Sequence, residues 1–392
     1  MKFATRLLNF DPAPGDRISP ACTPIYQTAT FRQQDATEFG EYDYSRSGNP
    51  TRAAVEKQIA ALESGTRGFC FSTGLAAITA VTRLVSPGEE ILACDDLYGG
   101  TYRLFSRILA NRGIEVRYLD FSDPNALAAE INEKTRLVYL ESPTNPLLQV
   151  IDIATVSEIA HRSGALVCVD NSTMSPYLQR PLELGADIVL HSATKFLCGH
   201  SDVMAGAVVV DDGRLAEELY LIQNGEGAVL SPFDSYLLLR GMKTLALRLD
   251  RQQPNARTVA AFLSTHPAVE HVYYPGLADR RQQQIHRSQA SGDGAVVSFT
   301  TGDPELSRAV VEATRLFAIT VSFGGVNSTI SLPNYMSHAS IPAHLKQQKK
   351  IPADLVRISV GAEDAEDLVG DLSAAFEQAG RRSCASQALA AD

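Results

Sequence analysis

Short apolar runs alternate with amphipathic stretches between residues 51 and 214. Apolar runs of this kind, separated by helical stretches, are typical of strands that are buried on both faces. The pattern predicts strands at residues 67–71, 90–94, 115–119, 136–140, 165–169, 187–191 and 205–210. It predicts helices at residues 52–64, 75–85, 101–112, 124–133 and 153–163. This order predicts an α/β fold with a mostly parallel seven-stranded sheet and helices on both faces.

The pattern changes after this region. A long helical region, 213–263, is followed by strands at 269–273, 294–300 and 356–360 and by a helix at 365–379, which predicts a smaller α+β domain. The first 50 residues show weak periodicity and predict an extended arm. We therefore expect an arm at 1–50, an α/β domain at 51–244, an α+β domain at 245–380 and a disordered tail at 381–392.

Composition excludes several classes of function. The net charge of −10 argues against a nucleic-acid partner. The chain has no apolar run long enough for a membrane span and no apolar signal core, so we expect no membrane partner and a cytoplasmic location. The cysteines form no C-x-x-C pair and the histidines no H-E-x-x-H, so no metal site is expected. A glycine-rich dinucleotide fingerprint is also missing, which sets aside a nicotinamide oxidoreductase.

Polar residues follow three of the predicted strands. Ligands bind at the carboxyl ends of strands in such sheets, so these residues are candidates for a site. Gly74 and Leu75 follow a Ser-Thr pair where a strand turns into a helix, a position suited to an anion but also to simple helix capping. Asp170 ends a hydrophobic strand, and Ser192, Thr194 and Lys195 follow the next one.

Together these strand ends provide an anion cradle, a carboxylate and an amine. They fit pyridoxal phosphate: its aldehyde at Lys195, its ring nitrogen at Asp170, and its phosphate at Gly74, Ser192 and Thr194. A partly desolvated lysine loses affinity for its proton and becomes a nucleophilic amine.

Two further clusters contain arginines. Tyr44 and Arg46 lie on the arm, where they fit a phosphate in the same subunit's site or in a neighbour's, or form a solvated loop. Arg357 lies in an alternating strand and fits a substrate carboxylate, with a surface salt bridge as the alternative.

Five stretches of the chain, 44–51, 96–101, 141–146, 170–172 and 191–202, resemble the Cys/Met metabolism family of pyridoxal-phosphate enzymes, the trans-sulfuration enzymes. The resemblance extends from about residue 5 to residue 380. It implies the fold of type I transferases that depend on this cofactor, and a homotetramer built from two dimers with sites shared between subunits.

The resemblance also implies roles for particular residues. Lys195 is the expected Schiff-base lysine, Asp170 the partner of the ring nitrogen and Tyr98 the residue that stacks on the ring. The residues expected around the phosphate are Gly74, Leu75, Ser192 and Thr194, with Tyr44 and Arg46 from a neighbouring subunit. Those expected around the substrate are Arg357, Ser322 and Asn145, with Val321 and Phe323 shaping the pocket.

Within the family, stretches 23–31, 174–182, 321–324 and 336–342 are similar to plant-type cystathionine β-lyases. Departures occur at Leu75, where methionine is common, at Asn327, where many members are acidic, and at Val321, where some γ-lyases have a carboxylate. The resemblance therefore implies a carbon–sulfur lyase that converts cystathionine to homocysteine, pyruvate and ammonia. Cystathionine γ-lyase, cystathionine γ-synthase, O-acylhomoserine sulfhydrylase and a non-catalytic cofactor-binding protein remain alternatives.

Overall fold

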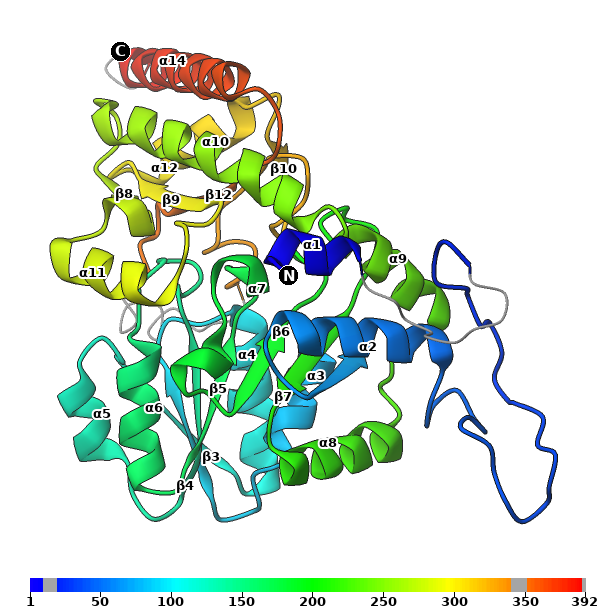
Figure 1. The fold of residues 1–392 in the computed structure, drawn as a ribbon. Coiled ribbons are helices and arrows are strands. Elements are labelled where there is room, and N and C mark those ends of the chain that lie inside the picture. Colours follow the sequence, from blue (N-terminus) through cyan, green and yellow to red (C-terminus); the bar gives the residue numbers. More distant parts are fainter. Residues whose placement is uncertain (10–19, 340–350, 390–392) are drawn as a thin grey trace.

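The computed structural model describes residues 1–9, 20–339 and 351–389 and contains two β-sheets covered by helices (Figure 1). The larger sheet has the strand order β1-β7-β6-β5-β4-β2-β3. Its strands are β1 (Arg67–Phe71), β2 (Glu90–Cys94), β3 (Glu115–Leu119), β4 (Thr135–Glu141), β5 (Leu166–Asp170), β6 (Ile188–His191) and β7 (Gly206–Val210). β7 is antiparallel to β1 and β6, and the other neighbouring pairs are parallel. The predicted α/β fold with a mostly parallel seven-stranded sheet is confirmed.

In β1, β6 and β7, alternate side chains belong to two different hydrophobic clusters. In β7, Val208 and Val210 join the cluster that includes residues of α3 and α8, whereas Ala207 and Val209 join the cluster that includes residues of α2. Both sets are fully buried. Because successive side chains of a strand point to opposite faces, both faces of the sheet are covered at these strands.

The helices start and end where the sequence has capping residues. Asn49 caps α2 by accepting hydrogen bonds from two backbone N–H groups, with Pro50 as the first helical residue. Gly227, with φ of +77°, ends α8, and Pro232 starts α9, so the long helical region expected at 213–263 is divided into three helices. The α-helices are α1 (Phe3–Leu8), α2 (Pro50–Leu62), α3 (Gly74–Thr82), α4 (Gly99–Arg103), α5 (Pro124–Glu130), α6 (Ile153–Arg162), α7 (Ser175–Leu178), α8 (Gly213–Glu226), α9 (Pro232–Met242), α10 (Leu245–Thr265), α11 (Arg280–Gln289), α12 (Pro304–Ala313) and α14 (Ala365–Leu389).

The smaller sheet lies in the C-terminal part of the chain, next to α10, α12 and α14 (Figure 1). Its strand order is β10-β11-β12-β9-β8. The strands are β8 (His271–Tyr273), β9 (Val296–Thr300), β10 (Ala318–Ile319), β11 (Thr329–Ser331) and β12 (Val356–Ser359). The pattern of the sequence missed β10 and β11, because two or three residues are too few to show an alternation.

The two ends of the chain differ from the expectation. Within the predicted arm, residues 3–8 form α1, and Leu7 is buried in the cluster that contains residues of α2. Residues 20–49 have little regular structure and project from the body of the molecule (Figure 1). At the other end α14 continues to Leu389, through most of the segment expected to be a disordered tail, and residues 390–392 lie outside the described part. The domain boundaries stay a prediction.

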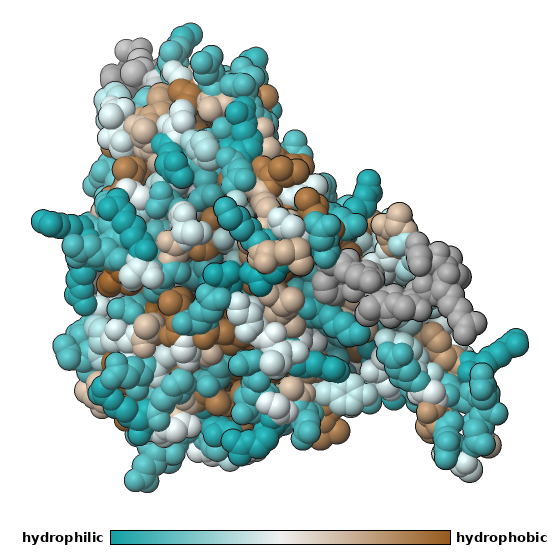
Figure 2. Space-filling view, viewed as in Figure 1, coloured by the Kyte–Doolittle hydropathy of each residue, from teal (hydrophilic) through white to brown (hydrophobic). Residues whose placement is uncertain are grey.

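The outer surface is predominantly hydrophilic on the face seen in Figure 2, where hydrophobic residues form small scattered groups. Among the helices of the described residues, none has the length and apolarity needed to cross a bilayer.

Candidate active site

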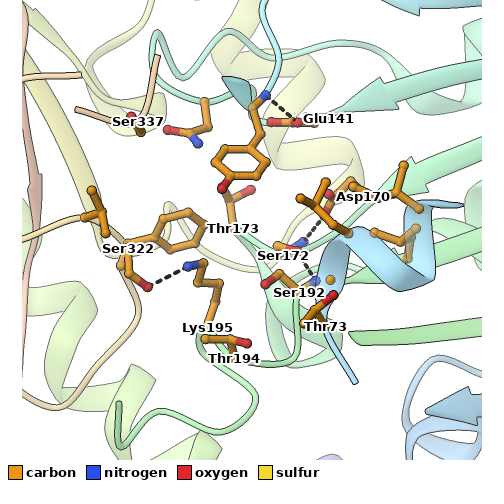
Figure 3. Close-up of a pocket in the computed structure, with 18 of the residues that line it drawn as sticks. Thr73, Glu141, Asp170, Ser172, Thr173, Ser192, Thr194, Lys195, Ser322 and Ser337 are labelled. Atoms are coloured by element: carbon orange, nitrogen blue, oxygen red, sulfur yellow. Dashed lines mark hydrogen bonds between the residues drawn. The ribbon is translucent and has the colours of Figure 1, made fainter. Parts of the chain in front are cut away.

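A cavity of about 420 Å³ opens at the carboxyl ends of β4, β5 and β6 (Figure 3). One wall consists of these strand ends and the start of α3, and the other comes from the C-terminal part of the chain. Its lining includes Thr73, Gly74, Leu75, Tyr98, Arg103, Glu141, Asn145, Asp170, Ser172, Thr173, Ser192, Thr194, Lys195, Met204, Val321, Ser322, Phe323, Met336, Ser337 and Arg357. A cavity at this edge of a doubly covered sheet is the expected position for a ligand.

The start of α3 forms one end of the cavity. The Thr73 hydroxyl accepts a hydrogen bond from the Ala76 N–H (3.0 Å) and so caps the helix. A Cβ atom at Gly74 would lie 2.9 Å from the Cβ of Ser192, so only glycine allows α3 to pack this closely against the segment after β6. The backbone N–H groups of a helix start and the hydroxyls of Ser192 and Thr194 therefore share one region of the cavity. This combination suits a phosphate group.

Asp170 lies at the carboxyl end of β5 and is 8 % exposed. It accepts hydrogen bonds from the Ser172 N–H (3.0 Å) and the Tyr139 hydroxyl (3.2 Å). Burial raises the pKa of Asp170, while the hydrogen bonds to Ser172 lower it. A buried carboxylate with a raised pKa is poised to take a cationic partner.

Lys195 extends into the cavity from the segment that follows β6 (Figure 3). Its Nζ donates a hydrogen bond to the Ser322 hydroxyl at 2.5 Å. Burial and the nearby Arg357 cation lower the pKa of Lys195 from 10.5 to about 8, against the opposite effect of Asp170. More of this amine is therefore neutral near physiological pH than of an ordinary lysine, as suits a nucleophile or base.

Arg357, on β12, forms part of the opposite wall and is 2 % exposed. Its Nη1 donates to the Asn145 side-chain oxygen (2.8 Å) and its Nη2 to the backbone carbonyl of Ser322 (2.7 Å). Its Nε is buried with no hydrogen-bond partner among the described residues. Burial lowers the pKa of Arg357 to about 10, so the guanidinium stays charged at neutral pH. A buried cation held only by neutral groups is a suitable site for a carboxylate.

Tyr98 lies just before α4, and its backbone N–H donates to Glu141 Oε1 (2.9 Å). A Cβ atom at Gly100 would lie 2.3 Å from the Tyr98 ring, so glycine is needed beside the ring. Phe323 lies near two cations, with its ring centroid 5.2 Å from Lys195 Nζ and 5.3 Å from the guanidinium of Arg357.

The predicted cofactor and substrate residues thus meet in one cavity, except for the two from the arm. Tyr44 and Arg46 are absent from the lining of this chain's cavity. Arg46 Nε instead donates to the Asn224 side-chain oxygen (3.3 Å), and its guanidinium lies 5.2 Å from the Tyr44 ring centroid. Of the three possibilities for Tyr44 and Arg46, a contribution to the site of the same subunit is disfavoured.

The family model for Cys/Met metabolism PLP-dependent enzymes, where PLP is pyridoxal phosphate, matches residues 4–377. The chain belongs to this family. It is 54% identical over 376 residues to the chloroplastic cystathionine beta-lyase of Arabidopsis thaliana, covering 95% of this chain and 80% of the relative. It is 45% identical to a cystathionine gamma-lyase of Bacillus subtilis, covering 96% of this chain and 100% of that relative. The crystal structure of cystathionine gamma-lyase from Lactobacillus plantarum complexed with L-serine superposes with a TM-score of 0.94 at 42% identity, covering 97% of this chain and 100% of that one.

The cavity fits the cofactor of the family. It contains a lysine amine with a lowered pKa, a buried carboxylate that can face a ring N–H, and a helix start with hydroxyls that can face a phosphate. The sequence-based expectation of a PLP enzyme is confirmed.

The expected cytoplasmic location is wrong as an inference from the sequence. Relatives from Arabidopsis thaliana and Mimosa pudica, 54% and 51% identical, are chloroplastic, which overturns this expectation.

Several lining residues were missed by the sequence analysis. Arg103 lies at the end of α4, the short helix that follows Tyr98, and is a second arginine of the cavity. Helical spacing after Tyr98 would have drawn attention to it. Met204, Met336 and Ser337 have no such signal, because only the packing of distant segments brings them to the cavity.

Proposed function

We propose that this chain catalyses β-elimination from cystathionine and releases homocysteine, pyruvate and ammonia. The observation that supports this most directly is the position of the Lys195 amine, whose pKa is lowered to about 8, in the same cavity as Arg357. A base and a carboxylate-binding cation on facing walls suit proton removal from the α-carbon of an amino acid.

PLP, when bound, supplies an aldehyde that captures amines and a ring that withdraws electrons from the neighbouring carbon. Arg357 binds the α-carboxylate of the substrate, with Asn145 and Ser322 fixing the guanidinium. Lys195 Nζ removes the proton from Cα, and the same atom delivers a proton to the departing sulfur. The hydrogen bond to Ser322 keeps Nζ on the substrate side of the cavity.

The other wall would hold the cofactor. Asp170 would accept a hydrogen bond from the protonated ring nitrogen of the cofactor, and the Tyr98 ring would pack against the cofactor ring. The phosphate would be held by the N–H groups of Gly74 and Leu75 and the hydroxyls of Ser192 and Thr194. Each assignment is supported by the lining of the cavity.

The rest of the cavity fits the distal half of a dicarboxylic substrate. Arg103 is a second cation for a carboxylate, whereas Val321 and Phe323 give the wall an apolar part suited to a thioether chain. Cystathionine has both features. The apolar Val321 favours β-cleavage over γ-cleavage, since no carboxylate is present at this position.

The assembly that we propose is a homotetramer of two dimers. Tyr44 and Arg46 lie outside this chain's own cavity, and the projecting arm gives them reach toward another molecule. They would complete the phosphate site of a neighbouring subunit.

Cystathionine γ-cleavage is the second candidate. It is supported by the likeness to γ-lyases in sequence and in fold. The same lysine can serve both reactions, because γ-cleavage needs only an additional proton removal at Cβ.

The deciding experiment is product analysis of the PLP-loaded enzyme with cystathionine. We expect pyruvate and homocysteine, and about a 10⁴-fold slower turnover for Lys195→Ala, which also loses the absorption of lysine-bound cofactor. Release of 2-oxobutyrate and cysteine would replace the proposal by γ-cleavage. Turnover only with an O-acylhomoserine and a thiol would indicate a synthase or sulfhydrylase.

A further inference from the structure

Buried polar contacts join one part of the arm, residues 44–47, to the large sheet. We call these four residues the arm motif. Arg52, in the first turn of α2, is 2 % exposed. Its Nη1 donates to the backbone carbonyl of Ser45 (2.5 Å) and its Nη2 to that of Arg46 (3.0 Å). One buried guanidinium thus holds two consecutive carbonyls of the arm motif.

The partner of Arg52 lies one turn later on the same helix. Glu56 Oε1 is 3.4 Å from Arg52 Nε. The same oxygen accepts hydrogen bonds from the Cys70 N–H of β1 (2.9 Å) and from the Gln223 side chain of α8 (3.3 Å). Burial raises the pKa of Glu56 and the Arg52 cation lowers it. Glu56 supplies the countercharge that a buried guanidinium needs and fixes it to the sheet.

These contacts determine the shape of the arm motif. The planar fork of an arginine that donates to two carbonyls fixes both peptide planes, which a lysine cannot do. The Arg46 side chain is not used for this purpose, since it contacts Asn224 and the Tyr44 ring. The motif therefore has a fixed backbone, while its two functional side chains remain on the accessible side at the end of α8.

We propose that Arg52 and Glu56 are positioning residues that act in trans: they fix the arm motif so that Arg46 and Tyr44 can bind the PLP phosphate of a second copy of this chain. The inference rests on the sharing of sites proposed above. It implies that loss of Arg52 damages the neighbour's cofactor site and leaves the cavity of its own subunit intact.

The first measurement is PLP affinity of the full-length apoprotein, by equilibrium dialysis. We expect Arg52→Ala to weaken PLP binding on the order of 10–100-fold, the usual effect of removing a partner that orients a ligand-holding residue. Arg52→Lys should weaken PLP binding nearly as much, because lysine keeps the charge but lacks the planar fork that donates to both carbonyls. Glu56→Gln should weaken PLP binding less. Arg162→Ala, which removes an exposed helix pair on α6, is the matched control and should bind like wild type. Wild-type affinity for both Arg52 variants would overturn the proposal.

The second measurement separates action in trans from damage to the subunit's own fold. Arg52→Ala and Lys195→Ala chains with different tags are co-expressed, and assemblies with both tags are assayed at PLP concentrations that saturate wild type but not Arg52→Ala. Symmetric interfaces exchange the same contacts in both directions. In a mixed pair, the site of the Arg52→Ala subunit therefore has its own Lys195 and receives the unaltered arm of the other subunit, whereas the second site lacks Lys195. Each mixed pair should have one intact site and about half the wild-type activity. If Arg52→Ala does not fold, Arg52→Lys takes its place.

The pair Arg46→Ala and Lys195→Ala is tested in parallel. If it regains activity and the Arg52 pair does not, the role of Arg52 is overturned while the sharing of sites stands. If neither pair regains activity, the sharing and the inference both fail. The lyase reaction is judged separately, by the products of the wild-type enzyme.

Discussion

The two walls of the cavity differ in how the chain builds them. The wall with Asp170 and Lys195 consists of segments that follow neighbouring parallel strands of one sheet, so their meeting follows from the sheet itself. The facing wall comes from loops and β12 of the smaller sheet. There Ser322 has φ of +88° and Gly324 has φ of +86°, and a Cβ atom at Gly324 would lie 2.6 Å from the Phe196 N atom.

The difference relates structure to chemistry. The sheet wall holds the groups that suit the cofactor, and the facing wall holds Arg357 and Val321, which suit the substrate. Loops in general tolerate substitutions and insertions more readily than buried strand ends do. This division agrees with a family in which related enzymes cleave different bonds, and it predicts that variants of the two walls change different kinetic parameters.

Apart from the loss of Lys195, the largest effect is expected for Asp170→Asn on the sheet wall. The amide keeps the size of the side chain but removes the negative charge opposite the ring nitrogen, so kcat should fall by about 10²–10³-fold with little change in KM. Steady-state kinetics with cystathionine and the PLP content of the purified variant test this. A large rise in KM at unchanged kcat would contradict the division between the walls.

Arg357→Lys, on the facing wall, should show the opposite pattern. Lysine keeps the charge but loses the paired hydrogen bonds, so KM should rise by about 10–100-fold, while PLP affinity stays close to wild type. The control is Arg308→Lys, an exposed arginine on α12, for which KM should not change. Weakened PLP binding in Arg357→Lys would show that the two walls do not act separately.

The smallest effect is on stability and concerns Lys195, which contacts both walls. Burial and Arg357 lower its pKa from 10.5 to about 8, so the folded apoprotein bears the cost of a buried charge below pH 8. Lys195→Met should stabilise the apoprotein by about 1–3 kcal/mol there. The gain should fade between pH 8 and 10.5, where the wild-type folded state has already lost the proton that the unfolded state still binds.

Urea unfolding of both apoproteins at pH 7 and pH 10 measures this difference. A gain that is equal at both pH values would mean that packing, and not the charge of Lys195, is responsible.

The sheet wall follows from the amino-acid sequence alone. Each strand of the large sheet is a run of apolar residues, buried on both faces, and parallel strands align their carboxyl ends. The residues after β5 and β6 therefore have to share an edge, and the pattern of the chain is sufficient to assign Asp170 and Lys195 to one site. The motifs around them also indicate the correct family and cofactor.

The facing wall and the position of the arm depend on tertiary structure. β10 and β11 are too short to leave a pattern, and Met204 and Met336 reach the cavity only because segments far apart in the sequence pack together. Arg357 can be found from its strand, but its contacts with Asn145 and Ser322 depend on backbone angles that no periodicity encodes. Local patterns specify elements and their ends, whereas contacts between distant loops depend on the packing of the whole chain.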